Sequence, residues 1–293
     1  MKPFLALFSL IPVISSLTVV AEDDYHEMPN GWSYHSSCIL PIGLSSYDKA
    51  SLSPCPYPPK KTTRTPHSEV AASYYSDWSV YAQSVSSSGI THMSSTWTVP
   101  SKPANHGPAS QSSVYIFNGL EDGGGIHGKA SVILQPVLQY GKSGCLLNPA
   151  KWNGWYASSY VVDGNGRAHC ASLIEANEGD EIVGIMERSV DDNVWNVTTF
   201  VKGREDEVSF NQVDLGDIEI DSAYATMEGM VVYTCDTFPG EGRIDFYENV
   251  LIDGKGNGIG DINWVEEVRH DECDQGVKVG SGGEVSLTWD PTL

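Results

Sequence analysis

Short apolar runs, many of them alternating with polar residues, follow one another from about residue 73 to the end of the chain. A period of two predicts strands, and the Gly, Asn and Asp residues between the runs predict turns. No long segment has a helical period. The expected strands are 93–99, 113–118, 131–140, 155–162, 170–176, 181–187, 194–201, 208–213, 225–233, 243–250, 261–268 and 284–289. About twelve strands with glycine-rich turns predict an all-β fold, a two-sheet antiparallel β-sandwich of the concanavalin-like jelly-roll type.

The first 67 residues differ from this pattern. Residues 1–21 combine Lys2 with an apolar run that ends in small residues at Ala21, which predicts a secretory signal peptide. Residues 22–67 are rich in proline and show little alternation, which is typical of a pro-segment or a linker. We therefore expect a signal peptide, a pro-segment and one β-sandwich domain at 68–293, in a secreted, extracellular protein.

Charge separates the pro-segment from the predicted sandwich. Residues 49–67 hold four basic side chains and no acid, whereas residues 68–293 hold 12 basic and 33 acidic residues. The whole chain has a net charge of −21, which disfavours nucleic acids and anionic membranes as partners. Two interpretations of the basic segment stay open. It is either a solvated tether or the inhibitory segment of a zymogen, which docks by charge on the acidic domain and is released when carboxylates are protonated.

Six cysteines lack the spacing of a zinc site, and in an exported protein an even set favours disulfides. The sequence does not determine how they pair. Asn196 begins the one glycosylation sequon and predicts a surface glycan. The chain contains no serine-hydrolase, zinc-protease or Walker A motif, and we expect no metal or other cofactor.

Polar residues interrupt two otherwise apolar strands. Gln135 and Gln139 share one face of the strand 131–140, and Glu228 lies in the apolar strand 225–233. Such residues either face solvent on an exposed sheet or belong to a functional site.

An ordered series of motifs from about residue 73 to residue 290 resembles the glutamic peptidases, the eqolisin family. The matching segments are 76–78, 96–100, 117–121, 133–136, 153–156, 178–182, 227–229 and 245–247. The resemblance implies a β-sandwich acid endopeptidase without a metal, and it carries the catalytic pair of the family onto Gln135 and Glu228. The chain departs from the family pattern at four positions, Phe117, Pro136, Ala157 and Gly229.

The residue types suit this chemistry. Glu228 is expected to act as the general base, while Gln135 orients the water and donates to the developing oxyanion. The candidate substrate-binding residues are Trp155, Tyr156, Gln139 and Glu121. We expect the substrate to be a protein or a peptide, and we expect the enzyme to be a monomer.

Two alternatives to the peptidase stay open. In the first, the same sheet face binds a glycan or a cell-surface ligand without turnover, as in a lectin. In the second, the chain is a glucanase, but retaining glycoside hydrolysis needs two nearby carboxyl groups and the strand after Glu219 lacks the second one.

Overall fold

The chain divides into two compact units, Met1–Ile39 with Cys55–Ser68, and Leu40–Pro54 with Glu69–Leu293. The computed structural model describes residues 75–105, 112–123, 130–143, 145–146, 148, 151–189, 192–258 and 262–293, and three strands before them. Those three strands form an antiparallel sheet in the first unit: β1 (Tyr25–Met28), β2 (Trp32–His35) and β3 (Lys60–Lys61). The sequence did not predict them, because strands of two to four residues are too short to show a period. The signal peptide, Cys38 and Cys55 lie outside the described residues.

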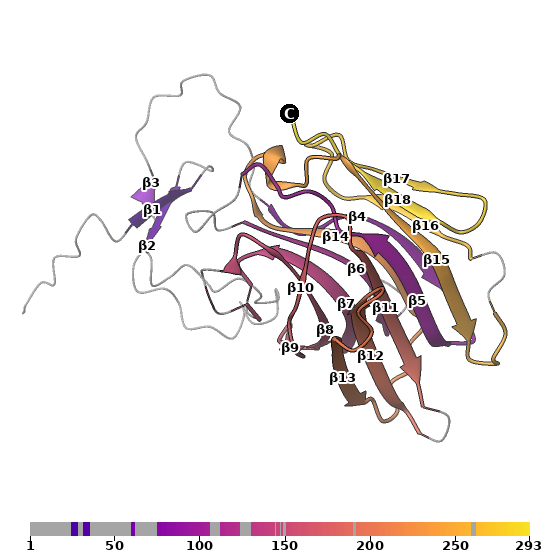
Figure 1. Cartoon of the computed structure of the whole chain (residues 1–293). Helices are drawn as coiled ribbons and strands as arrows, with labels where there is room; N and C mark the ends of the chain where they lie inside the picture. Colours follow the sequence, from indigo (N-terminus) through magenta and orange to yellow (C-terminus); the bar gives the residue numbers. More distant parts are fainter. Residues whose placement is uncertain are drawn as a thin grey trace, which may run out of the picture. The chain divides into compact units, whose positions relative to one another are not determined.

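The second unit contains two antiparallel sheets (Figure 1). The eight-stranded sheet has the order β10-β8-β7-β6-β14-β4-β16, and β9 pairs with β8. Its strands are β4 (Tyr75–Val85), β6 (Ser113–Glu121), β7 (Val132–Gly141), β8 (Trp155–Asp163), β9 (Ala168–Cys170), β10 (Ile174–Ala176), β14 (Ser222–Val232) and β16 (Val265–Val268).

The seven-stranded sheet has the order β13-β12-β11-β5-β15-β18-β17. Its strands are β5 (Ile90–Thr98), β11 (Glu181–Arg188), β12 (Val194–Val201), β13 (Val208–Asp214), β15 (Arg243–Asp253), β17 (Gly276–Val279) and β18 (Val285–Thr288). The described residues form no α-helix, and one short 3₁₀ turn spans Cys235–Thr237. The predicted two-sheet sandwich is confirmed. The segment expected as one strand at 170–176 is instead the end of β9 and the separate strand β10.

The core lies between the two sheets and follows the alternation of the strands. Leu134 and Leu138 of β7 belong to it, together with Trp97 of β5 and Trp195 of β12, and all four are at most 1% exposed. Burying an aromatic or leucine side chain stabilises a fold by roughly 1.5–3 kcal/mol relative to leaving it exposed. The apolar positions that predicted the strands therefore also hold the sheets together.

The two sheets lie in close contact at Gly184 of β11. A Cβ atom at this position would lie 2.4 Å from Asn118 Oδ1 and 2.5 Å from Pro136 Cβ. Asn118 Nδ2 donates a hydrogen bond to the Gly184 carbonyl oxygen at 3.2 Å. Pro136 thus faces the core, directly behind the position that Gln135 occupies on the opposite face of β7.

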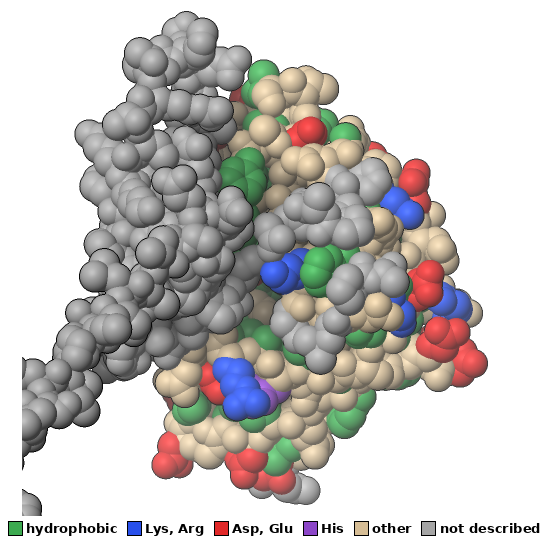
Figure 2. All heavy atoms as spheres, turned by 90° about the vertical axis from the view of Figure 1, so that its left-hand side faces the viewer, with side chains coloured by type: hydrophobic (Ala, Val, Ile, Leu, Met, Phe, Trp, Pro, Cys, Tyr) green, Lys and Arg blue, Asp and Glu red, His purple; other side chains and the backbone are tan. Residues whose placement is uncertain are grey.

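Two disulfides join described cysteines, Cys145–Cys170 and Cys235–Cys273. They agree with the expected use of cysteine. No helix among the described residues has the length and hydrophobicity needed to span a membrane. On the face drawn in Figure 2, acidic and basic side chains are interspersed, so the net negative charge does not gather there in one patch.

Candidate active site on the outer face of the eight-stranded sheet

The face of the eight-stranded sheet that points away from the core carries a second cluster of side chains. Its buried members are aromatic apart from one valine: Trp78, Tyr81, Phe117, Val137, Tyr160 and Tyr224. The Trp78 ring meets those of Tyr224 and Phe117 edge-on, with centroids 4.9 and 5.5 Å apart. Such pairs contribute about 0.5–1.5 kcal/mol beyond their buried area. The outer face is therefore a packed surface, and the polar groups on it are held in place.

Gln135 lies on this outer face. It pairs with Tyr160 of β8, and the flanking pairs Phe117↔Val137 and Leu120↔Leu134 put Gly119 of β6 beside it. Gly119 in turn pairs with Tyr224 of β14. Gln135 is 6% exposed, and its amide makes no side-chain hydrogen bond with the described residues.

Glu228 shares the outer face but lies far from Gln135. It pairs with Tyr115 of β6 and Trp78 of β4, four residues along β14 from Tyr224. With strands about 4.8 Å apart and a rise of about 3.3 Å per residue, the Gln135 and Glu228 Cα atoms are on the order of 16 Å apart. The structure does not bring the two residues of the expected catalytic pair together.

The carboxyl group near Gln135 is that of Glu121. Glu121 pairs with Ile133, two residues before Gln135, which makes Glu121 and Gln135 diagonal neighbours with Cα atoms about 7–8 Å apart. Long side chains reach across this separation. Tyr224 of β14, which is the diagonal neighbour of Glu121 on the opposite side of β6, spans such a separation. Its hydroxyl donates a hydrogen bond to Glu121 Oε1 at 2.5 Å.

A chain of hydrogen bonds orients the Glu121 carboxyl. Gln83 Nε2 donates to the Tyr224 hydroxyl oxygen at 3.0 Å, and that hydroxyl donates to Glu121. The second carboxyl oxygen, Oε2, makes no hydrogen bond with the described residues. Burial raises the pKa of Glu121 to about 7, since the effect of burial exceeds the lowering by the Tyr224 hydrogen bond. Near neutral pH this carboxyl can both take up and release a proton.

Glu228 belongs to a different group of residues. Burial, with a smaller contribution from Asp77, raises the pKa of Glu228 to about 7 as well. Among the described residues, Glu228 forms no hydrogen bond and no ion pair. Gln139 lies in the same cross-strand row, beyond Tyr115.

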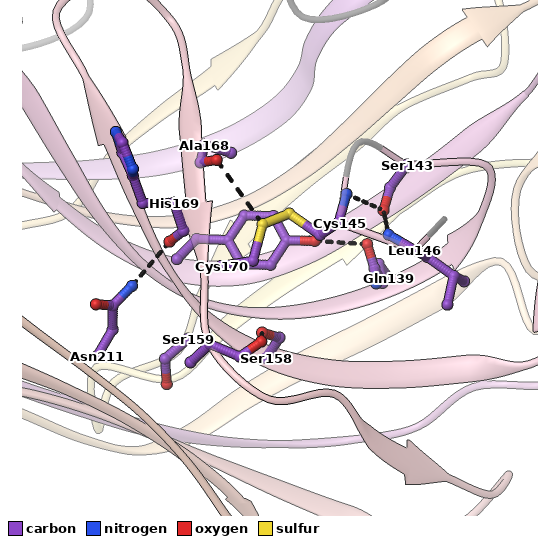
Figure 3. Close-up of a disulfide and its surroundings, with 12 residues drawn as sticks. Gln139, Ser143, Cys145, Leu146, Ser158, Ser159, Ala168, His169, Cys170 and Asn211 are labelled. Carbon is purple, nitrogen blue, oxygen red and sulfur yellow. Dashed lines mark hydrogen bonds between the residues drawn. A yellow bond between two sulfur atoms is a disulfide. The ribbon is translucent and has the colours of Figure 1, made fainter. Parts of the chain in front are cut away.

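Gln139 is fully buried between tyrosines and a disulfide. The Tyr160 hydroxyl donates to Gln139 Oε1 at 2.6 Å, next to the Cys145–Cys170 disulfide (Figure 3). The Gln139 Nε2 atom is buried and has no hydrogen-bond partner among the described residues. A buried donor without a partner costs free energy of folding, and no ligand reaches this amide at its 0% exposure.

The end of β14 after Glu228 is irregular. A Cβ atom at Gly229 would lie 2.5 Å from Val232 Cγ2, and Val231 has a φ of 57°, which is unfavourable for a β-branched residue. Ser76 accepts the Val231 N–H, and the Ser112 hydroxyl donates to the Val231 carbonyl oxygen. Strained backbone held by its surroundings is common at functional sites.

The remaining predicted substrate-binding residues lie in different places. Trp155 is 1% exposed and packs in the core between the sheets, so it does not line the outer face as expected. Its side chain alternates with that of Tyr156, which therefore lies on the outer face, opposite Gln139. The Lys151 ammonium lies 5.3 Å from the Tyr156 ring centroid.

Three of the four departures from the family pattern lie away from the outer face. Pro136 and Ala157 face the core, and Gly229 packs near Phe238. Phe117 alone faces outward, in the aromatic cluster. The departures therefore bear more on packing than on the polar groups of the outer face.

No group of three or more His, Cys, Asp or Glu side chains among the described residues is arranged to hold a metal ion. An open groove of about 530 Å³ lies on the seven-stranded sheet, and its lining includes Arg243 and Lys278. Asp245 and Ser286 already bind Arg243, which leaves the groove without a concentrated charge.

Tyr224 and Gln83, which orient Glu121, are not among the site residues predicted from the sequence. A signal for Tyr224 was present, because it lies on the same face as Glu228 by period two. Its partner could not be inferred, since the pairing of β14 with β6 joins residues about a hundred positions apart.

Comparison with known proteins gives a structural match only. Neither a protein-family model nor a curated protein sequence matches the chain. A crystal structure of scytalido-glutamic peptidase with a peptide-based transition-state analog matches with a TM-score of 0.52, at 14% identity, over 74% of this chain and 100% of that one. The sandwich has the fold of a glutamic peptidase.

Two further matches are weaker. A second structure of scytalido-glutamic peptidase, with a transition-state analog inhibitor, has a TM-score of 0.49 at 14% identity, over 74% of this chain and 100% of that one. The alginate lyase vAL-1 from Chlorella virus matches with a TM-score of 0.29 at 8% identity, over 52% of this chain and 85% of that one. At these identities the likeness concerns the fold and leaves the site to be argued from its own residues.

Proposed function

We propose that this protein is a secreted peptidase of the glutamic type, in which Glu121 transfers the protons and Gln135 donates to the oxyanion. The observation that carries the proposal is the diagonal placement of a buried, hydrogen-bonded carboxyl next to the Gln135 amide. The shared fold with a glutamic peptidase supports peptide-bond hydrolysis as the reaction. Two disulfides support synthesis for an oxidising compartment.

The chemistry needs one carboxylate and one amide donor. Ionised Glu121 removes a proton from a water molecule, which attacks the peptide carbonyl carbon. The Gln135 Nε2 group donates to the carbonyl oxygen as it becomes an oxyanion. Glu121 then returns the proton to the leaving amine, the C–N bond breaks, and the carboxyl is ready for the next cycle.

The pKa of Glu121 sets the pH range. At about 7 it lies well above the ordinary value of 4.5, so the base form is scarce at pH 3 to 4 and grows toward neutral pH. Turnover that depends on this base should rise as the pH approaches 7. This differs from the acid optimum that the family resemblance implies, and the cause is burial of the carboxyl.

The assignment of the base to Glu228 stays as a rival prediction. Its pKa is raised to about the same value, and it is the more exposed of the two glutamates. However, it has Gln139 rather than Gln135 in its row, and Tyr115 lies between the two side chains.

One observation favours the alternative of a binding protein without turnover. Glu121 and Gln135 are only 3% and 6% exposed, which limits the access of a peptide to them. A glycan or cell-surface ligand would then bind to the outer face as in a lectin.

The experiment is cleavage of a denatured protein by the full chain between pH 3 and pH 8. The variants are Glu121→Gln, Gln135→Ala and Glu228→Gln, the last being a matched control on the same face. Loss of proton transfer or of an oxyanion donor lowers turnover about a hundredfold or more, so the first two variants should be nearly inactive. Glu228→Gln should retain cleavage of neutral substrates.

Other outcomes decide between the rivals. Loss of turnover in Glu228→Gln with retention in Glu121→Gln would return the base to Glu228. A folded chain that cleaves nothing at any pH, and that binds glycans on an array, would identify a lectin-like protein.

A further inference from the structure

Glu228 sits between two aromatic rings on the outer face. Trp78 of β4 and Tyr115 of β6 are its direct cross-strand partners, and the Cβ atoms of such partners are about 4.5–5.5 Å apart. A carboxylate beside aromatic side chains can bind a cation, since carboxylates pair with cations and aromatic rings attract positive charge.

No cation of the described residues occupies this position. Glu228 has neither a hydrogen bond nor an ion pair among those residues, although it is partly exposed. The Arg269 guanidinium is engaged by the Asp77 carboxylate at 2.9 Å. Asp77 itself adds to the negative charge near Glu228 and raises its pKa, as burial does.

We propose that Glu228 and its aromatic neighbours form a binding site for a lysine or arginine side chain of a bound peptide. The inference rests on the proposed peptidase function, because the peptide is the substrate. Glu228 then sets specificity, some 16 Å from the reacting groups at Gln135 by the strand geometry. This distance corresponds to about four to five residues of an extended peptide.

The cation has two sources. One is a basic residue of a substrate. The other is this chain's own segment 49–67, which contains the basic residues Lys49, Lys60, Lys61 and Arg64 and no acid. In the second case the segment competes with basic substrates for Glu228.

The test is calorimetric binding of two blocked pentapeptides to the full chain, one with a central lysine and one with a central norleucine. Binding is measured for the unaltered chain, for Glu228→Gln, for Glu121→Gln as the matched control, and for a chain with Lys49→Gln, Lys60→Gln, Lys61→Gln and Arg64→Gln. A charge-assisted contact is worth about tenfold or more in affinity, so lysine should bind about tenfold better than norleucine. That preference should disappear in Glu228→Gln and persist in Glu121→Gln.

A preference for lysine seen only after the four basic residues are replaced would support the site and identify the chain's own segment as its occupant. The proposal would be overturned if the lysine and norleucine peptides bound equally well both to the unaltered chain and to the chain with four replaced basic residues. It would also be overturned if Glu228→Gln kept the full preference for the lysine peptide. Binding that depends on Glu228 in a chain without turnover would reject the peptidase and leave the cation site standing.

Discussion

The two glutamates on the outer face have similar acidity and different surroundings. Both have a pKa near 7, and burial is the main cause in each case. Glu121 is fixed by the Tyr224 hydroxyl and lies beside an amide, whereas Glu228 lacks a hydrogen bond among the described residues and lies between aromatic rings. A raised pKa alone therefore does not identify a catalytic carboxyl. The neighbours within hydrogen-bond reach distinguish a group that moves protons from one that holds a charge.

The largest expected effect at the two glutamates is on stability as a function of pH. The folded-state pKa of Glu121 is about 7 and the ordinary value is 4.5, so its contribution is fully present below pH 4.5 and is lost as the pH rises through 7. For a side chain this buried, the loss is on the order of 3 kcal/mol. The unfolding free energy, measured with urea from pH 4 to pH 8, should fall less steeply in Glu121→Gln than in the unaltered chain.

Glu228→Gln is the matched comparison for that measurement. Because the pKa of Glu228 is raised to about 7 as well, its replacement should flatten the profile by a similar amount. A profile that neither replacement changes would contradict the raised pKa values of both glutamates.

A substitution behind Gln135 should disturb one region and spare the other. In Gly184→Ala, the new methyl group would meet Asn118 and Pro136 at about 2.5 Å or less. Overpacking of this kind costs about 1–3 kcal/mol, and it should displace β7 at Gln135. The melting temperature and turnover should both fall, while the lysine preference at Glu228 should be retained.

Gly258→Ala serves as the control, since no atom lies within 4 Å of a Cβ atom at that position. An equal loss of lysine preference and turnover in Gly184→Ala would show that the two regions are not independent.

The most local expected effect concerns the hydroxyl of Tyr224. Its hydrogen bond lowers the pKa of Glu121, so Tyr224→Phe should raise that pKa and move the rise of turnover to higher pH. A hydrogen bond to a charged group is worth about 1.5–3 kcal/mol, which corresponds to a shift of about one pH unit or more. The pH profile of kcat/KM measures this shift.

Tyr81→Phe is the matched control, because Tyr81 lies in the same aromatic cluster and forms no hydrogen bond with either glutamate. A profile unchanged by Tyr224→Phe would argue that Glu121 is not the group that limits turnover.

The fold was largely predictable from the sequence because alternation is a local property. Strand β12 agrees with its predicted range at both ends, and most others differ by a few residues. Strand β4 was not predicted as a full strand. Side chains on both faces of β4 are buried, so apolar and polar residues do not alternate along it. The pairing with β14 is also irregular near Ser79, because Trp78 lies opposite Glu228 while Val80 lies opposite Met227.

The site was predictable only in part, for a reason of geometry. Alternation correctly puts Gln135, Gln139 and Glu228 on the outward face of their strands, but it does not tell which residues of different strands lie side by side. That depends on register between β6, β7 and β14, which are distant in sequence. The register puts Tyr224 in the row of Gln135 and Glu121 on the diagonal next to Gln135.

Pro136 also has a consequence for motion. Proline has no N–H group, and the β6–β7 pairing is interrupted between Phe117↔Val137 and Leu120↔Leu134, whereas the β7–β8 pairing continues through Pro136↔Ser159. The two sides of β7 are therefore held unequally, and β6 can separate from it locally at lower free energy than β8 can. Such an opening would begin beside Gln135 and give water a route to a residue that is otherwise almost wholly enclosed.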